Sequence, residues 1–141
     1  MKRFLAGMAS VMVLLTMFAC AGMKSFEHDE KYSLDDQLET VTEIHKFTMR
    51  SWEKVDSQSF VLQTGAGTYY LIVLIRPSTE LMFTENMKIS STGSSVKPGF
   101  DKVTVYQAGK AEEYVINKIY KFKDYEQVKE IEAQLTGKEQ K

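Results

Sequence analysis

The sequence predicts a mainly β domain, a small antiparallel barrel or sandwich of about six strands with a C-terminal amphipathic helix. Three observations indicate this class. Short segments rich in β-branched and aromatic residues recur over residues 47–122, turn residues separate them, and a helical spacing of apolar residues follows. The chain has 141 residues, which suits one domain with a modest hydrophobic core.

The first 19 residues have the composition of a bacterial signal peptide. Lys2 and Arg3 give a positive start, residues 4–18 are apolar or small, and the first acidic residue is Glu27. The apolar stretch has the length of a signal-peptide core and is shorter than the about 20 residues of a membrane-spanning helix. We therefore expect residues 1–19 to be a lipoprotein signal peptide.

The end of this leader, Met17-Phe18-Ala19-Cys20, resembles a bacterial lipobox. The resemblance implies cleavage before Cys20 and attachment of lipid, palmitate included, to that residue. Cys20 is the only cysteine, so an intramolecular disulfide is impossible and lipidation explains the single thiol. By resemblance to bacterial sorting rules, Ala21 favours the outer membrane. The alternatives are an ordinary signal peptide cut after Ala19 or Ala21, and an uncleaved membrane anchor.

The segment over residues 20–36 is expected to be a flexible tether, because it is polar and has few apolar residues. His28 lies there among acidic residues, and a solvated linker is favoured over a metal site because the segment offers no rigid scaffold and no second histidine. Of the 18 basic residues, Lys2 and Arg3 belong to the leader, which leaves 16 against 19 acidic residues, a net charge of −3. This balance argues against nucleic acid as a partner.

The domain itself is expected over residues 37–136. Ser33 is a candidate helix cap, and Leu38, Val41 and Ile44 follow at a helical spacing. Strands are then expected over residues 47–55 and 60–63, with a glycine-containing hairpin turn at 65–67. The unbroken apolar run over residues 69–75 is the best candidate for the central strand.

The second half of the domain begins at Pro77, which ends the central strand because it has no N–H to donate. A single helical turn is expected over residues 78–81, with Leu81 and Phe83 folding back onto the core. Short strands are expected over 88–91 and 101–107, and a longer one over 113–122 whose core candidates are Tyr114, Ile116 and Ile119. A helix then begins after Asp124, with Val128, Ile131 and Leu135 on one face, and residues 137–141 are expected to fray.

The body also resembles a family of proteobacterial envelope proteins, often lipoproteins, that is catalogued only as a domain of unknown function. The residues that carry the resemblance are Trp52-x-x-Val55-Asp56, Thr64-Gly65, Tyr70-Leu71, Ser91-Thr92-Gly93, Phe100-Asp101-x-Val103-x-Val105 and Ile116-x-x-Ile119-Tyr120. The resemblance implies an envelope location and a β-rich fold, but no activity. It also implies a pair of cysteines at two positions that are Ser78 and Tyr114 in this chain, so both cysteines are absent.

Catalytic chemistry is not expected. A nucleophilic triad needs a base, and the only histidines, His28 and His45, precede the β body. The plausible carboxylates, Asp56 and Asp101, lie at turns, where aspartate commonly bonds its own backbone. We expect no catalytic residue, metal ligand or cofactor, and regard a hydrolase as a distant third possibility.

Four aromatic residues are candidates for a ligand or partner surface, although core and rim packing explains them equally well. They are Trp52, Tyr69, Tyr70 and Tyr106. We expect an outer-membrane lipoprotein whose periplasmic β domain is a non-enzymatic protein-interaction or envelope-maintenance module. The alternative is a small-molecule or glycan-binding module. Periplasmic lysozyme-inhibitor barrels are a more distant comparison, because their cysteine framework and inhibitory loop are not visible.

Overall fold

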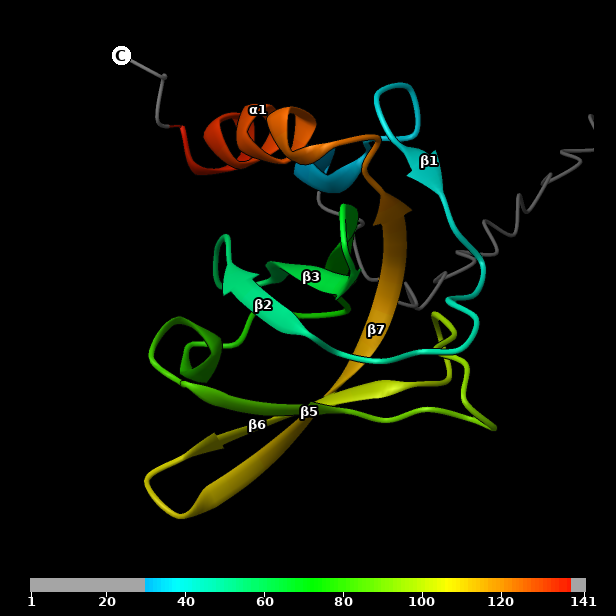
Figure 1. Ribbon diagram of the computed structural model, residues 1–141. Helices are drawn as coiled ribbons and strands as arrows, with labels where there is room; N and C mark the ends of the chain where they lie inside the picture. Colours follow the sequence, from blue (N-terminus) through cyan, green and yellow to red (C-terminus); the bar gives the residue numbers. More distant parts are fainter. Residues whose placement is uncertain (1–29, 138–141) are drawn as a thin grey trace, which may run out of the picture.

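The computed structural model describes residues 30–137 (Figure 1). The expected signal peptide, Cys20, the first part of the expected tether and the end of the tail lie outside the described residues. No helix within residues 30–137 is long and apolar enough to span a membrane.

Seven antiparallel strands form one curled sheet, a half-barrel, and one helix follows it. In chain order the strands are β1 (Glu39–Thr40), β2 (Ser51–Lys54), β3 (Ser59–Gly65), β4 (Thr68–Leu74), β5 (Asn86–Ile89), β6 (Lys102–Gln107) and β7 (Lys110–Lys121). The helices are α1 (Tyr125–Thr136) and the two short 3₁₀ turns η1 (Glu30–Tyr32) and η2 (Glu80–Met82). The expected mainly β class with a C-terminal helix is confirmed.

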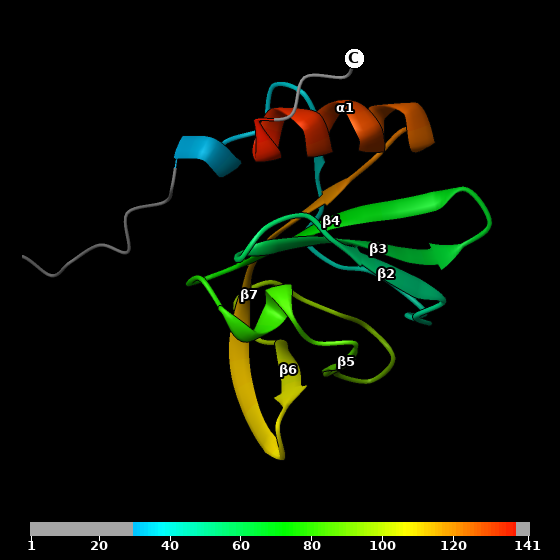
Figure 2. The same cartoon turned by 90° about the vertical axis from the view of Figure 1, so that its left-hand side faces the viewer.

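Strand β7 connects the two wings of the sheet. The spatial order is β2-β3-β4-β7-β6-β5, and β1 pairs with β7 outside this path. The first half of β7 pairs with β6, and its second half pairs with β4 and β1. Figure 2 shows the result: β7 curves from the wing that carries β2–β4 to the wing that carries β6 and β5.

An irregularity in β7 explains its apolar spacing. Val73 of β4 lies opposite Lys118, whereas its neighbour Leu74 lies opposite Ile116, so Asn117 is the extra residue of a β-bulge. The bulge shifts the alternation by one residue and allows Ile116 and Ile119 to face the same core.

Two hydrophobic cores lie on opposite faces of the sheet. The inner core fills the space between the wings, with members that include Phe60, Leu62, Ile72, Leu74, Leu81, Val103, Val105, Tyr114, Ile116 and Ile119. The outer core lies between the other face and α1, with members that include Tyr32, Leu34, Leu38, Val61, Leu71, Val73, Tyr120, Val128, Ile131 and Leu135. Strand β4 therefore contains residues 69–74 of the expected central strand, and its residues 71–74 are covered on both faces.

The helix expected from Ser33 to Ile44 is wrong. Residues 41–50 form no helix but cross the open side of the curled sheet with a turn at His45 and Lys46, and Ile44 exchanges backbone hydrogen bonds of 2.9 and 3.1 Å with Val96. Leu38 is buried in the outer core and Ile44 in the inner core, with Val41 packed against it. The three-residue spacing thus reflects a chain that passes from one core to the other.

The end of the expected tether is packed against the domain. Tyr32 and Leu34 are only 2% and 1% exposed. The Tyr120 hydroxyl donates to the Tyr32 carbonyl at 2.6 Å and lies 3.3 Å from the Leu34 N–H, which donates to it. Tyr32 and Leu34, which fall within the expected tether, thus contribute to the outer core beside α1.

Three local expectations have different outcomes. The strand expected over 47–55 is restricted to β2, and the single turn after Pro77 is η2, which buries Leu81. Phe83 does not fold onto the core but is 73% exposed. Asp124 caps α1 as expected, since its Oδ1 accepts from the Gln127 N–H at 2.9 Å.

Candidate functional site

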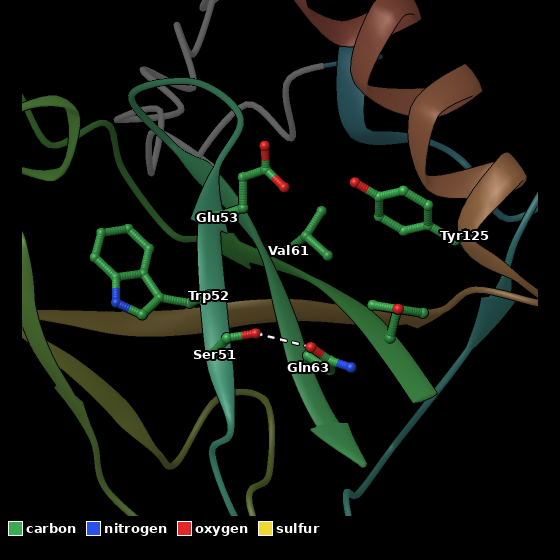
Figure 3. Close-up of a pocket in the computed structure, with 7 residues that line it drawn as sticks. Ser51, Trp52, Glu53, Val61, Gln63 and Tyr125 are labelled. Atoms are coloured by element: carbon green, nitrogen blue, oxygen red, sulfur yellow. Dashed lines mark hydrogen bonds between the residues drawn. The ribbon is translucent and has the colours of Figure 1, made fainter. Parts of the chain in front are cut away.

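An open cleft of about 380 Å³ lies between the start of α1 and the outer face of strands β2–β4. It is lined by Ser51, Trp52, Glu53, Val61, Gln63, Tyr69 and Tyr125 (Figure 3). Its size falls within the range of about 300–1,000 Å³ that small-molecule sites occupy. We therefore treat this cleft as the candidate site.

The strand register brings the lining residues together. Ser51 of β2 lies opposite Gln63 of β3, and Gln63 lies opposite Tyr69 of β4. Glu53 lies opposite Val61 in the same way. Alternate residues of a strand share a face, so these side chains project from the same side of the sheet. The wall opposite them is Tyr125, the first residue of α1.

The floor and the aromatic wall of the cleft combine polar and apolar groups. The Ser51 hydroxyl donates to Gln63 Oε1 at 2.9 Å, and Gln63 Nε2 donates to the Gly65 carbonyl at 3.3 Å. The rings of Tyr69 and Tyr125 pack at a centroid distance of 5.4 Å. Lys129, one turn along α1, places Nζ 5.0 Å from the centre of the Tyr125 ring. The wall thus carries ring faces of the kind that attract cations.

Glu53 adds negative charge to the cleft. Glu132 of α1 is not one of the lining residues, and its Oε1 is buried without a hydrogen-bond partner among the described residues. Burial, followed by the charge of Glu53, raises the pKa of Glu132, while Lys129 opposes this shift. The charge of Glu53 therefore disfavours ionisation of Glu132.

The four aromatic residues expected to form a surface do not form one groove. Tyr69 faces the cleft, but Trp52 packs edge-to-face on Phe60 at 6.1 Å on the inner side, and Figure 3 shows its ring pointing away from Tyr125. Tyr70 packs against the same inner core. Tyr106 lies at the far end of the sheet on β6. Strand alternation separates Tyr69 from Tyr70, because neighbouring residues face opposite sides.

A second candidate surface lies at the other end of the molecule, where η2 lies beside β6. Met82, Phe83 and Tyr106 are exposed there, and we call these three residues the apolar end. Thr84 fixes the arrangement, since its hydroxyl donates to the Tyr106 carbonyl at 2.6 Å and accepts from the Asn86 N–H at 3.1 Å.

The two candidate carboxylates bind to their own surroundings, as expected for aspartates at turns. Asp101 accepts from the Lys97 N–H at 2.7 Å and the Ser90 hydroxyl at 2.8 Å. Asp56 accepts from the Gln58 N–H at 2.8 Å. His45 lies on the surface, with Nδ1 3.6 Å from a Glu43 oxygen.

Ser78 and Tyr114, the positions at which the resemblance implies a cysteine pair, meet in the structure. The Ser78 hydroxyl lies 3.2 Å from Glu80 Oε2, and the Tyr114 hydroxyl lies 2.9 Å from the same oxygen and 2.7 Å from Glu112 Oε2. Burial, with the acceptor carboxylates of Glu112 and Glu80, raises the pKa of Tyr114. The tyrosine therefore serves as a neutral donor that links β7 to η2.

Sequence reasoning missed most of the cleft. The alternation of residues 51–54 places Glu53 on the face opposite Trp52, which was a usable signal. Tyr125 has no such signal, because its place depends on how α1 lies across the sheet. That placement follows from the outer core and not from local spacing.

Comparison with known proteins gives a family but no function. The profile of a family of unknown function, DUF6491, matches residues 1–139. Neither the curated proteins nor the solved structures contain a significant match.

Proposed function

We propose that this chain, which belongs to the DUF6491 family, is a lipid-anchored protein of the bacterial envelope whose β domain is a non-enzymatic interaction module. The anchor is supported by the positive start, the apolar stretch over residues 4–18 and the lipobox-like end at Cys20. In this proposal the lipid holds the protein at the outer membrane, facing the periplasm, and the domain binds an envelope protein or helps to maintain the envelope.

The apolar end is the observation that carries the interaction part. Phe83 lies between η2 and β5 and is 73% exposed, and Met82 and Tyr106 are exposed as well. Gathered exposed apolar side chains are typical of protein-binding surfaces. Lys54 donates to the Met82 carbonyl at 2.8 Å, which adds a positive charge at the rim. A partner with an apolar centre and an acidic rim fits this surface.

Two substitutions test the anchor and its sorting. Cys20→Ser should abolish incorporation of radiolabelled palmitate and release the protein from the membrane fraction. Ala21→Asp should keep the label but move the protein to the inner-membrane fraction. Unchanged labelling of the Cys20→Ser variant would contradict lipidation, and an unchanged location of labelled Ala21→Asp protein would contradict outer-membrane sorting.

Crosslinking in living cells tests the partner surface. A photoreactive amino acid at position 83 should give one discrete adduct, whose partner is identified by mass spectrometry. Position 100 is the matched control, because Phe100 is 79% exposed but precedes β6 instead of lying at the apolar end. The same adducts from both positions, or none from position 83, would contradict the proposal.

The cleft favours a second candidate function, binding of a small molecule or glycan. The observation is the tyrosine pair at 5.4 Å above a floor that carries the Gln63 amide. Aromatic faces with a few polar groups are typical of small-ligand sites. Titration of the ¹⁵N-labelled domain with the neutral sugar chitobiose tests this candidate. Saturable shifts of the amide signals of residues 51–53, 61–63 and 125 would support it, and no saturable shift up to about 50 mM would contradict it.

A further inference from the structure

Strand β2 forms one edge of the sheet, and part of its main chain is unpaired. The Val55 N–H donates to the Ser59 carbonyl at 3.1 Å, and from that point the residues of β2 alternate between bonding to β3 and facing outward. The N–H and C=O groups of Trp52 and Lys54 therefore face away from β3. Among residues 30–137 these four groups have no hydrogen-bond partner.

The edge of β2 is accessible, whereas the other end of the strand order is covered. That end is formed by β5, in which Met87 is only 7% exposed. In β2, by contrast, Ser51, Glu53 and Lys54 are exposed. Trp52 lines the cleft although its ring lies on the other side of the strand, so the cleft reaches β2 close to its main chain (Figure 3). Accessible unpaired edges of this kind can pair with an added strand.

We propose that an extended peptide segment of a partner protein adds to the free edge of β2 as an antiparallel strand, with an acidic residue opposite Lys54 and a basic residue opposite Glu53. The inference goes beyond the proposed function, because it names a second binding surface, and it depends neither on the apolar end nor on the lipid anchor. Main-chain hydrogen bonds to Trp52 and Lys54 supply the affinity, and the two charged pairs supply the selectivity.

A second copy of this chain does not fit the edge, because like charges would meet. In an antiparallel pair about a two-fold axis, the outward-facing residues Trp52 and Lys54 pair either with each other or each with its own copy. When Trp52 faces Lys54, the two copies of Glu53 meet. When Trp52 faces its own copy, Lys54 meets Arg50, and in the remaining register two copies of Lys54 meet. Like charges directly opposite each other destabilise strand pairs.

A peptide with an acidic, a basic and a β-branched residue in that order suits the edge. Because an antiparallel strand runs the other way, these residues lie opposite Lys54, Glu53 and Trp52 in turn. The basic residue lies on the face of Glu53, beside the cleft, and the acidic residue lies on the opposite face with Lys54. The β-branched residue lies beside the half-buried Trp52, and aromatic and β-branched side chains pack well across strands.

Two peptides of identical composition provide the test, acetyl-Ser-Thr-Glu-Lys-Val-Thr-Ser-amide and the charge-exchanged acetyl-Ser-Thr-Lys-Glu-Val-Thr-Ser-amide. The protein is the ¹⁵N-labelled chain from residue 20 onward with Cys20→Ser, which is the expected processed chain without lipid. In the free chain the amides of Trp52 and Lys54 should exchange rapidly with solvent. The first peptide should shift the amide signals of residues 51–54 in a saturable way, with a Kd on the order of 1 mM. The charge-exchanged peptide should bind about fivefold more weakly.

Variants of β2 separate the main-chain contacts from the charges. Lys54→Pro removes the outward N–H and should abolish saturable binding, and proline is tolerated at an edge where that N–H has no partner in the fold. Lys54→Ala is the matched control, because it also loses the ammonium group but keeps the N–H, and it should weaken binding only about threefold. The double variant Glu53→Lys with Lys54→Glu should prefer the charge-exchanged peptide about fivefold. Circular dichroism checks the fold, and the double variant decides if Lys54→Pro unfolds.

Each outcome decides for or against the inference. Saturable binding that is lost in Lys54→Pro and reversed in the double variant supports it. Equal binding of both peptides, binding that survives Lys54→Pro, or no saturable shift up to about 10 mM peptide would overturn it. Slow exchange of the Trp52 amide in the free chain would also overturn it, because the edge would already be covered. Sedimentation would then show whether a second copy or the chain's own residues before 30 cover it. Crosslinking from position 83 tests the apolar end separately.

Discussion

Replacing Asp56 by alanine should destabilise the domain strongly, because its carboxylate joins the start of the domain to the turn between β2 and β3. Oδ2 accepts from Lys31 Nζ and from the Tyr32 hydroxyl, both at 2.7 Å. Oδ1 accepts from the Gln58 N–H and the Ser59 hydroxyl, both at 2.8 Å. Four donors lose their acceptor when the carboxylate is removed.

The magnitude follows from the burial of those donors. Lys31 is partly exposed and its ion pair is screened, so its loss costs at most about 1 kcal/mol. The hydroxyls belong to Tyr32 and Ser59, which are buried, and each donor left without an acceptor costs about 1–3 kcal/mol. We expect the free energy of unfolding of Asp56→Ala to fall by about 3 kcal/mol.

Urea unfolding followed by the fluorescence of Trp52, the single tryptophan, measures this loss. With a urea m-value of about 2 kcal/mol per molar, the midpoint should fall by about 1.5 M. Asp36→Ala is the matched control, because Asp36 is an exposed aspartate in the segment that also contains Lys31 and Tyr32. The unfolding midpoint of this variant should stay within about 0.3 M of the parent value. An equally small shift for Asp56→Ala would refute the reasoning.

The pH dependence provides an independent check on Asp56. Burial opposes ionisation, but the hydrogen bonds from Lys31, Tyr32, Gln58 and Ser59 hold the pKa of Asp56 below its ordinary value of 3.8. The stabilisation is therefore fully present above that value and is lost as pH falls through the lower pKa of the folded state. The stability difference between the parent and Asp56→Ala should shrink in acid.

Three further predictions follow from the helix cap, the bulge and the carboxylate pair. Asp124→Ala should lower the free energy of unfolding by about 1 kcal/mol through loss of the N-cap, measured by urea unfolding. Deletion of Asn117 should keep the native fold, seen as retained dispersion of the amide signals, because Ile116 and Ile119 then stand two residues apart and share a face of a regular strand. Glu132→Gln should raise stability at pH 7 by up to about 1 kcal/mol, since the raised pKa of Glu132 marks a charge that burial and Glu53 disfavour. That gain should disappear in acid, where Glu132 is already protonated, and a constant gain from pH 3 to 7 in thermal unfolding would contradict its electrostatic origin.

The strands and the final helix could be predicted from local patterns. Val103 and Val105 alternate with polar neighbours, and residues 69–75 are apolar throughout, so both patterns report directly on burial. Asp124 stands before an apolar stripe and caps α1 for a reason that is local to the sequence. Elements of this kind can be predicted from the local sequence without information on what they pack against.

The parts that failed depend on long-range packing. Leu38, Val41 and Ile44 have a helical spacing. The chain is not helical there, and it covers these side chains because it passes from the outer core to the inner core. Tyr32 and Leu34 look like isolated apolar residues in a polar segment, yet the outer core buries both. The β-bulge at Asn117 could not be predicted from the sequence either, because the Ile-x-x-Ile spacing fits a helix as well as an interrupted strand.

The candidate cleft was recognised only in part for the same reason. The sequence indicates Tyr69 as a possible surface residue, but Tyr125 comes from α1, and only the docked helix places it at the cleft with Glu53. Trp52, Tyr69 and Tyr70 are all aromatic, but the strand register places Tyr69 on the outer face and the other two against the inner core.

The packing of residues 30–38 has a mechanical consequence. Tension applied from the amino-terminal side reaches the domain at Tyr32, which is held by the Tyr120 hydroxyl and the Asp56 carboxylate and not by a ladder of strand hydrogen bonds. We expect these side-chain contacts to break before the strand pairing does. Release of nine residues would lengthen the link by up to about 30 Å while β2–β7 stay paired. Residues 30–38 can therefore extend under tension without loss of the strand pairing in the domain.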